Sequence, residues 1–260
     1  MNTTENSRAL FWRRVSPFLV GFNLLIMWWI LAERQVFTSA IFPHPLEVWI
    51  GMGEEIRSGR MIRDLLSSLY RVSFGFSLAV VLGVPLGLWL GNNAAGRAAF
   101  LPGINFCRNL SPLAWIPFAI LWFGVGDKPA VFLIFMATFF PLVLSTMSAV
   151  ANIPNVFYRV AHDYGLHGLD LFLEVTLPAI MPQLITTLRV TAGLSWLVVV
   201  AAEMLAGDSG LGFGIWDARN GLRNDLLVAL MLVIGTIGVF LDRMLSLLAN
   251  LPSVRWGYER

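Results

Sequence analysis

Long apolar runs separated by short polar breaks dominate this chain. A helix needs about 20 mainly apolar residues to cross a bilayer, and runs of that order recur along the whole sequence. Lipid offers no partner for unpaired backbone groups, so each run is expected to be helical. The pattern predicts about six membrane spans, at residues 15–33, 70–91, 108–125, 129–151, 182–205 and 225–248.

Prolines interrupt the third and fourth of these spans. Pro112 and Pro117 fall in the third, Pro129 and Pro141 in the fourth, and residues 124–129 (GVGDKP) predict a tight turn between them. We expect a kinked helical hairpin whose freed backbone groups could line a cavity.

The connection between the first two spans mixes charged and apolar positions. Residues 46–68 follow a turn at residues 42–45 (FPHP), and their apolar positions recur at roughly helical spacing. This pattern predicts a helix lying at the membrane interface, with a solvated connector as the alternative.

Composition supports a membrane protein. Hydrophobic residues make up 57% of the chain and charged residues 13%, against about 25% charged in soluble domains. The net charge of +2 is too small to argue for nucleic acid. We expect one all-α transmembrane domain over residues 1–260. Cys107, the only cysteine, cannot form an internal disulfide and is expected to pack as a small apolar residue.

The N-terminal segment has two interpretations. Arg8, Arg13 and Arg14 precede the first apolar run, as basic residues do in a secretory signal. No Ala-x-Ala cleavage site follows, so a retained first span is expected.

Lys128 is the only lysine, and its setting excludes one mechanism. A phosphate-binding loop needs a lysine after its glycines, followed by Ser or Thr. Lys128 is followed by Pro129, so this chain has no such loop. Any ATP-driven work must come from a partner, and no cofactor is expected on this chain.

Residues 152–182, called the elbow here, form the longest polar break in the second half. They predict two short helices joined at glycines, with Gly165 stopping the first helix in the left-handed conformation and Gly168 relaxing the turn. Pro178 is expected to end the second helix. The elbow would be a rigid helical projection between the fourth and fifth spans.

Within the elbow, the chain resembles the inner-membrane permease subunits of bacterial ABC importers. Their signature, the EAA loop, runs Glu-Ala-Ala, three residues, Gly, nine residues, then Ile-x-Leu-Pro. This chain has residues 159–161 (RVA), Gly165 and residues 175–178 (VTLP) at the same spacing. Arg159 reverses the charge of the family's acidic residue, so a salt bridge that needs this acid is not available here.

Further segments resemble the nitrate, sulfonate, taurine and bicarbonate branch of that family. Residues 212–218 (GFGIWDA) lean toward the nitrate and bicarbonate members, and residues 162–168 (HDYGLHG) toward the sulfonate members. The other segments are 42–49 (FPHPLEVW), 67–75 (SSLYRVSFG), 111–117 (SPLAWIP), 121–124 (LWFG), 201–204 (AAEM) and 210–213 (GLGF).

The resemblance implies a type I ABC-importer permease fold and a defined set of partners. Two permeases, expected to be a homodimer, would flank a pathway for a small anion, and a periplasmic or lipid-anchored binding protein would deliver it. Two ATPase subunits, carrying ATP and Mg, would each hold one elbow. The family topology places the chain in the bacterial inner membrane with both termini and the elbow in the cytoplasm; the distribution of positive charge does not decide the orientation. The residues implied in coupling to the ATPase are Arg159, Ala161, His162, Tyr164, Gly165, Leu177 and Pro178.

Several polar residues are candidates for the pathway or a gate. Glu203, near the outer end of the fifth span, could close a gate or sense a docked binding protein; alternatively it is an interfacial acid bonded to a helix end. Arg108 and Arg189 could attract an anion or reach toward headgroups. Arg189 and Glu203 lie about 21 Å apart along one helix and are not expected to pair. The candidates are Asn105, Arg108, Ser111, Trp115, Arg189 and Glu203.

Other motifs carry no expected chemistry. His162 and His167 are five residues apart and would not share a helix face, so no metal site is expected. The glycines of residues 210–214 lack a dinucleotide fingerprint and predict a flexible outer loop. Three tryptophans could line the pathway or simply pack: Trp115, Trp122 and Trp196.

The favoured function is therefore an ATP-driven importer subunit with no catalytic residue of its own. A stand-alone channel or secondary transporter is the alternative, but it would need ionisable residues at the middle of the membrane, and the spans hold few. A membrane enzyme would need clustered His, Asp or Glu, which the sequence lacks. The elbow would also have no role in a stand-alone channel or secondary transporter.

Overall fold

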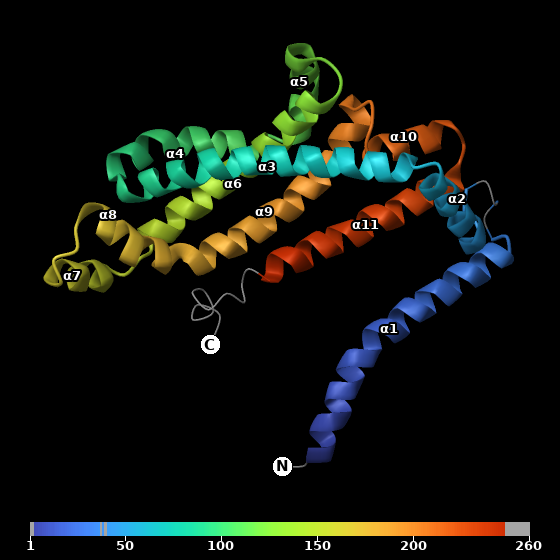
Figure 1. The fold of residues 1–260 in the computed structure, drawn as a ribbon, viewed down its shortest axis with the longest axis horizontal. Helices are drawn as coiled ribbons and strands as arrows, with labels where there is room; N and C mark the ends of the chain where they lie inside the picture. Colours follow the sequence, from blue (N-terminus) through green and yellow to red (C-terminus); the bar gives the residue numbers. More distant parts are fainter. Residues whose placement is uncertain (1–2, 37, 39–40, 248–260) are drawn as a thin grey trace.

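The computed structural model describes residues 3–36, 38 and 41–247, and this part of the chain contains helices and no strand. The long helices α3, α6 and α9 run between the two ends of the bundle, with α7 and α8 at one end and α2 and α10 at the other, while α1 and α5 point away from it (Figure 1). The elements are α1 (Thr3–Glu33), α2 (Pro45–Arg57), α3 (Arg60–Asn92), α4 (Ala94–Asn109), the 3-10 turn η1 (Pro112–Trp115), α5 (Ile116–Phe123), α6 (Asp127–Ala151), α7 (Asn155–Asp163), α8 (Gly168–Leu171), the π-turn η2 (Phe172–Thr176), α9 (Leu177–Ala206), α10 (Leu211–Asn220) and α11 (Asn224–Ser246).

Four helical stretches in the described residues are long and apolar enough to cross a membrane. They are α3, α6, α11 and the continuous run Gly168–Ala206. Two further apolar stretches, Phe18–Glu33 and Pro112–Phe123, are shorter. The chain is therefore an all-helical membrane protein, while the count of six spans stays a prediction.

α6 is the central helix, packed between α3 and α9. Its side chains Leu133, Ile134 and Leu142 are fully buried. α3 approaches α6 through small residues: a Cβ at Gly87 would lie 2.7 Å from the Cβ of Thr146. Small residues at such positions let two membrane helices come close.

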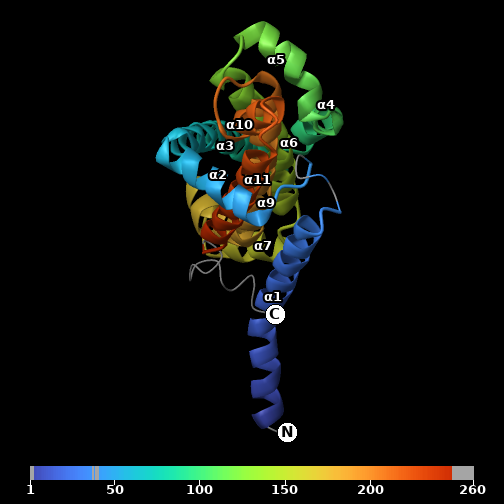
Figure 2. The ribbon, with the colours of Figure 1, turned by 90° about the vertical axis from the view of Figure 1, so that its right-hand side faces the viewer.

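α1 stands apart from this core. Figures 1 and 2 show its N-terminal half projecting away from the other helices. Near its other end, the Trp28 indole donates to the carbonyl of Pro43 at 3.2 Å and so ties α1 to the turn before α2.

The predicted third span, 108–125, is wrong as a single helix. α4 ends at Asn109, and η1 and α5 follow as separate short elements. Pro112 begins η1 and disfavours helical backbone at the residue before it, so α4 does not continue into η1. Pro117 lies in the first turn of α5, where its missing N–H breaks no bond. The pattern of apolar runs does not predict α4, because this helix carries Arg97 and Arg108 and is less apolar than the neighbouring helices.

The expected interruption of the fourth span by proline is wrong. α6 runs without a break through Pro141, and Pro129 lies in its first turn, where a missing N–H leaves no bond unmade. The turn before α6 is confirmed, but it spans only Gly124–Gly126.

The single interface helix predicted for residues 46–68 is also wrong. α2 ends at Arg57, Gly59 takes a left-handed φ of 73°, and α3 begins at Arg60. At the other end of α2, His44 and Glu47 form a reciprocal cap. The charged residues after Arg60 therefore belong to the first turns of the long helix α3.

Candidate functional site

The elbow starts with α7, which a glycine turn ends as the sequence predicts. Gly165 has a left-handed φ of 75°. Leu166 N–H donates to the Ala161 carbonyl at 2.9 Å and Gly165 N–H to that of His162 at 2.9 Å. This pairing is the Schellman arrangement, which favours glycine at the left-handed position. A Cβ on Gly165 would meet no atom within 4 Å, so the space beside it is open.

The second half of the elbow differs from the prediction, because no helix ends at Pro178. Helical structure continues from Gly168 to Ala206 through the π-turn η2. Leu177 N–H donates to the Phe172 carbonyl, five residues back. Proline cannot supply the next bond of a regular α-helix, and the wider turn accommodates this loss without a break.

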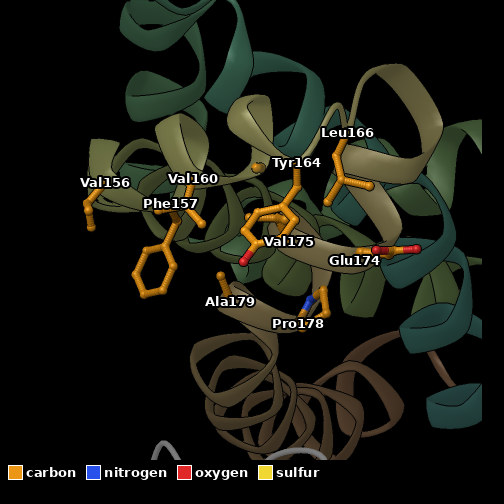
Figure 3. A pocket seen from close by; sticks show the side chains of 10 residues that line it. Val156, Phe157, Val160, Tyr164, Leu166, Glu174, Val175, Pro178 and Ala179 are labelled. Atoms are coloured by element: carbon orange, nitrogen blue, oxygen red, sulfur yellow. The ribbon is translucent and has the colours of Figure 1, made fainter.

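An apolar hollow of about 590 Å³, called the elbow groove here, lies between α7 and the η2–α9 junction. In Figure 3, Val156, Phe157 and Val160 lie at one end, Leu166 and Glu174 at the other. Tyr164, Val175, Pro178 and Ala179 complete the labelled lining.

Some of the residues implied in coupling line this groove, and the others do not. Ala161, Tyr164 and Pro178 line it. Ala161 is buried, whereas Tyr164 is 82% exposed. The groove is not lined by Arg159 or His162 of α7, by Gly165 in the turn after α7, or by Leu177 of α9.

His162 and His167 lie together although they belong to different elements. Their ring centroids are 5.0 Å apart, because the left-handed turn at Gly165 folds the chain back. The expectation that these two histidines lie apart assumes one continuous helix, and helix geometry does not hold across a turn. Within the described residues, no group of three or more potential ligands could hold a metal ion.

At the opposite end of the bundle, a buried ion pair joins α3 to α9. Arg71 Nη1 lies 2.8 Å from Glu203 Oε1, and both side chains are fully buried. Arg71 was not among the predicted site residues. Its signal was a polar stripe on an otherwise apolar helix: Asp64, Ser68 and Arg71 share one face at i, i+4 and i+7, and all three are buried.

This stripe caps the N-terminus of α10. Gly210 N–H donates to Asp64 Oδ1 at 3.1 Å, and Leu211 N–H donates to Ser68 Oγ at 3.0 Å. Gly212 N–H donates to Glu203 Oε2 at 3.0 Å. Carboxylates stabilise a helix N-terminus through these free N–H groups and the helix dipole. The flexible loop predicted for residues 210–214 is therefore wrong: most of it is the start of a capped helix.

Arg71 draws two further segments into the same site. Its Nε donates to Asp127 Oδ1 at 2.6 Å at the start of α6, and its Nη1 donates to the Ser209 carbonyl at 2.6 Å. We call Asp64, Ser68, Arg71, Asp127, Glu203 and Ser209 the Arg71 cluster. It fixes one end of α3, α6, α9 and α10 together.

The geometry of Glu203 agrees with the second prediction made for it, an acid that is hydrogen-bonded to a helix end. Glu203 accepts hydrogen bonds at a helix end, but it is buried rather than interfacial. Whether it also acts in a gate stays a prediction.

The other pathway candidates lie in two separate regions. Asn105 and Arg108 are in the last turns of α4, and Ser111 and Trp115 flank or form η1. Arg189, by contrast, lies on α9, where its guanidinium makes two bonds of 2.7 Å to Asp242 of α11. Their part in a pathway stays a prediction.

The three tryptophans that were candidates for the pathway also lie in two separate regions. Trp196 is buried and donates to the Ile234 carbonyl at 3.1 Å, so it packs α9 against α11. Trp115 and Trp122 belong to an aromatic group with Phe118 and Phe132 around α5.

Comparisons with known proteins identify the class. The family described as "Binding-protein-dependent transport system inner membrane component" matches residues 83–251. The chain belongs to this family, and it is a membrane-spanning permease subunit.

Individual relatives agree along most of the chain. The nitrate import permease protein NrtB of Leptolyngbya laminosa is 37% identical, over 92% of this chain and 88% of its own length. The taurine transport system permease protein TauC of Escherichia coli (strain K12) is 30% identical, over 93% and 92%. A chain of the inward-facing MetNI methionine ABC transporter has the same fold: the TM-score is 0.58 at 18% identity, covering 72% of this chain and 95% of that one. The type I permease fold implied by the resemblance is confirmed.

Proposed function

We propose that this chain is the permease subunit of an ATP-driven importer that passes a small anion from a binding protein into the cytoplasm. The single observation that carries the proposal is the elbow. It is a helical projection at one end of the molecule, and it is continuous with a membrane-spanning helix.

Mechanically, the elbow is one end of a long lever. The run Gly168–Ala206 has 39 residues, about 58 Å at 1.5 Å per residue. Its far end holds Glu203, which is bonded to α3 and α10. A displacement of the elbow is therefore passed along one rod to the opposite end of the bundle, as in a rigid-body transition between two packed states.

The partners follow from the family. Two ATPase subunits would bind ATP and Mg and would each hold one elbow, since this chain has no phosphate-binding loop of its own. A second copy of the chain would complete the pathway, and a periplasmic or lipid-anchored binding protein would dock near α2 and α10. In this arrangement the elbow and both termini are cytoplasmic, in the bacterial inner membrane.

The substrate class rests on the relatives. The relatives are named for nitrate and for taurine, both small solutes that carry an anionic oxygen group. We propose a substrate of the nitrate and bicarbonate class or of the sulfonate and taurine class. Growth of a deletion strain on nitrate, taurine or an alkanesulfonate as the sole nitrogen or sulfur source separates these classes.

Co-purification with the ATPase subunit tests the assembly. Gly165→Val places a branched residue at a φ of 75°, which such residues rarely adopt, and should abolish the complex. Gly165→Asn is the matched control for conformation, because asparagine tolerates the left-handed region. Loss with valine and retention with asparagine would show that the turn itself is required.

A transport assay separates the importer from its alternative. Liposomes that contain this chain alone should show no uptake, and uptake should require ATPase, ATP and binding protein together. Transport by the chain alone, down a solute gradient or against an ion gradient, would reject the importer in favour of a channel or secondary transporter.

A further inference from the structure

The elbow groove has an apolar lining that contains one charged residue. Phe157 and Val160 of α7 face Val175 and Ala179 across it, and Glu174 lies at one end (Figure 3). Its volume of about 590 Å³ falls within the range of small-molecule and side-chain pockets. The groove is therefore large enough to take an aromatic or branched side chain.

The apolar residues at the groove are not covered by this chain. Val156 is 59% exposed, and Phe157 and Val160 are each 48% exposed. They project from one side of α7, and the opposite side of this helix carries Asn155 and His162. A concentrated apolar surface with polar neighbours on so short a helix marks a place where another molecule binds.

Glu174 restricts the chemistry of that molecule. Among the described residues, no cationic side chain forms an ion pair with it. The carboxylate beside the hollow argues against a lipid chain as the molecule that fills it, because burying an unpaired charge in hydrocarbon is costly. It also opposes an anionic lipid surface by repulsion. A protein that offers an apolar side chain next to a basic one meets both requirements.

We propose that the elbow groove receives an apolar side chain of the ATPase subunit, and that an adjacent Arg or Lys of that subunit pairs with Glu174. This inference rests on the proposed function. It makes the contact reciprocal: the elbow is seated in the ATPase, and an ATPase side chain is seated in the elbow. Such a contact transmits force when the ATPases separate as well as when they close, so the same lever works in both directions.

Thiol protection tests whether the groove is occupied. Because Cys107 is the only cysteine, Cys107→Ser with Ala179→Cys gives a single thiol in the groove. In lipid nanodiscs, bound ATPase subunit should slow maleimide labelling of this thiol by at least roughly tenfold. The matched control, Cys107→Ser with Val125→Cys, places the thiol at a 67% exposed site away from the elbow and should be labelled at the same rate with and without ATPase.

Three outcomes of this experiment overturn the proposal. Equal labelling of Cys at position 179 with and without bound ATPase would show that the groove stays empty in the complex. Protection by nanodisc lipid alone would show that lipid covers it. If the unmodified chain fails to bind the ATPase at all, the proposed function fails and this inference falls with it; if the complex forms and the thiol stays reactive, only the inference fails.

Charge variants test the pairing at Glu174. Glu174→Gln should weaken ATPase binding about fivefold and Glu174→Lys by at least about tenfold, since a like charge would replace an attractive one. Asp170→Asn, a change of another exposed acid on the elbow that does not line the groove, should change binding less than about twofold. The thermal midpoint of the isolated chain should not move. Wild-type affinity in Glu174→Lys would overturn the pairing.

Discussion

Arg71 and Glu203 form an ion pair of 2.8 Å between two membrane-spanning helices, and neither side chain is exposed. They are 132 residues apart in the sequence. Around them, Ser68 donates to Glu203, and Arg71 reaches Asp127 and Ser209. Buried charges are tolerated only when their partners are complete, so the Arg71 cluster should respond sharply to the loss of any one member.

The first prediction concerns Arg71 itself. Arg71→Gln leaves Glu203 buried without its charge partner and should lower the free energy of unfolding by about 3–5 kcal/mol. Chemical or thermal unfolding in detergent measures the change. Arg223→Gln is the control, because its partners Asp225 and Glu54 are bonded at an exposed site; it should cost less than about 1 kcal/mol. Equal effects of the two variants would contradict the structure.

The second prediction separates assembly from gating at Glu203. Glu203→Gln keeps an oxygen that can accept from Gly212 but loses the charge that pairs with Arg71. The folded variant should still assemble with the ATPase, with a lower thermal midpoint and lower substrate-stimulated ATP hydrolysis. Unchanged transport would dismiss a gate role for Glu203.

The third prediction uses the glycines of α3 as a graded series. A Cβ at Gly91 would lie 2.5 Å from the Val150 Cβ, and one at Gly87 would lie 2.8 Å from the Val143 carbonyl. A Cβ at Gly83 would meet its nearest atom at 3.3 Å. Alanine at Gly91 or Gly87 should therefore destabilise α3–α6 packing by about 1–3 kcal/mol. Alanine at Gly83 should cost less, and the reverse order would show that α3 and α6 do not pack in this register.

The fourth prediction tests how tightly α10 is seated. A Cβ at Gly212 would lie 2.3 Å from the Val200 carbonyl, so Gly212→Ala should lower the thermal midpoint and weaken the capped end of α10. Gly235→Ala on α11 is the matched control, because nothing lies within 4 Å of a Cβ there. In a helix interior that change should be neutral or stabilise by up to about 1 kcal/mol.

The fifth prediction concerns Arg189 and Asp242, which link α9 to α11. Each single neutral substitution should lower the thermal midpoint only slightly, because the pair is about half exposed and screened by solvent. The exchange Arg189→Asp with Asp242→Arg should recover part of that loss. A double-mutant cycle in detergent measures the coupling, and an exchange variant no more stable than either single variant would contradict the prediction.

The elbow shows which features of the structure can be predicted from local sequence and which cannot. The spacing from residue 159 to residue 178 pointed to the family, and Gly165 stops α7 in the predicted conformation. The continuation through Pro178 could not be read from the sequence, since a proline is as compatible with a helix end as with a π-turn inside a longer helix. The structure has the second arrangement, in which the Leu177 N–H reaches the Phe172 carbonyl and the helix continues through Pro178.

The Arg71 cluster shows the opposite limit. Its polar stripe was visible along α3, but the partners lie on α6, α9 and the turn before α10. Residues 210–214 looked like a loop because glycines usually favour turns. Here Gly212 is needed for close approach to α9, and side chains of α3 and α9 cap the helix that follows.

The sequence by itself determined that the chain folds in a lipid membrane, that its fold is helical, and which family it belongs to. Apolar runs long enough to cross a bilayer are expected to fold as helices, because lipid offers no partner for unpaired backbone groups. The elbow motif can be read from the sequence because it is a local pattern. Only the tertiary structure decided which helices break, which polar residues meet and where the groove opens. The Arg71 cluster depends on contacts between segments far apart in the sequence, such as Arg71 with Glu203, 132 positions away. The groove depends on how two elements pack across a turn. The spacing along one helix carries no record of either.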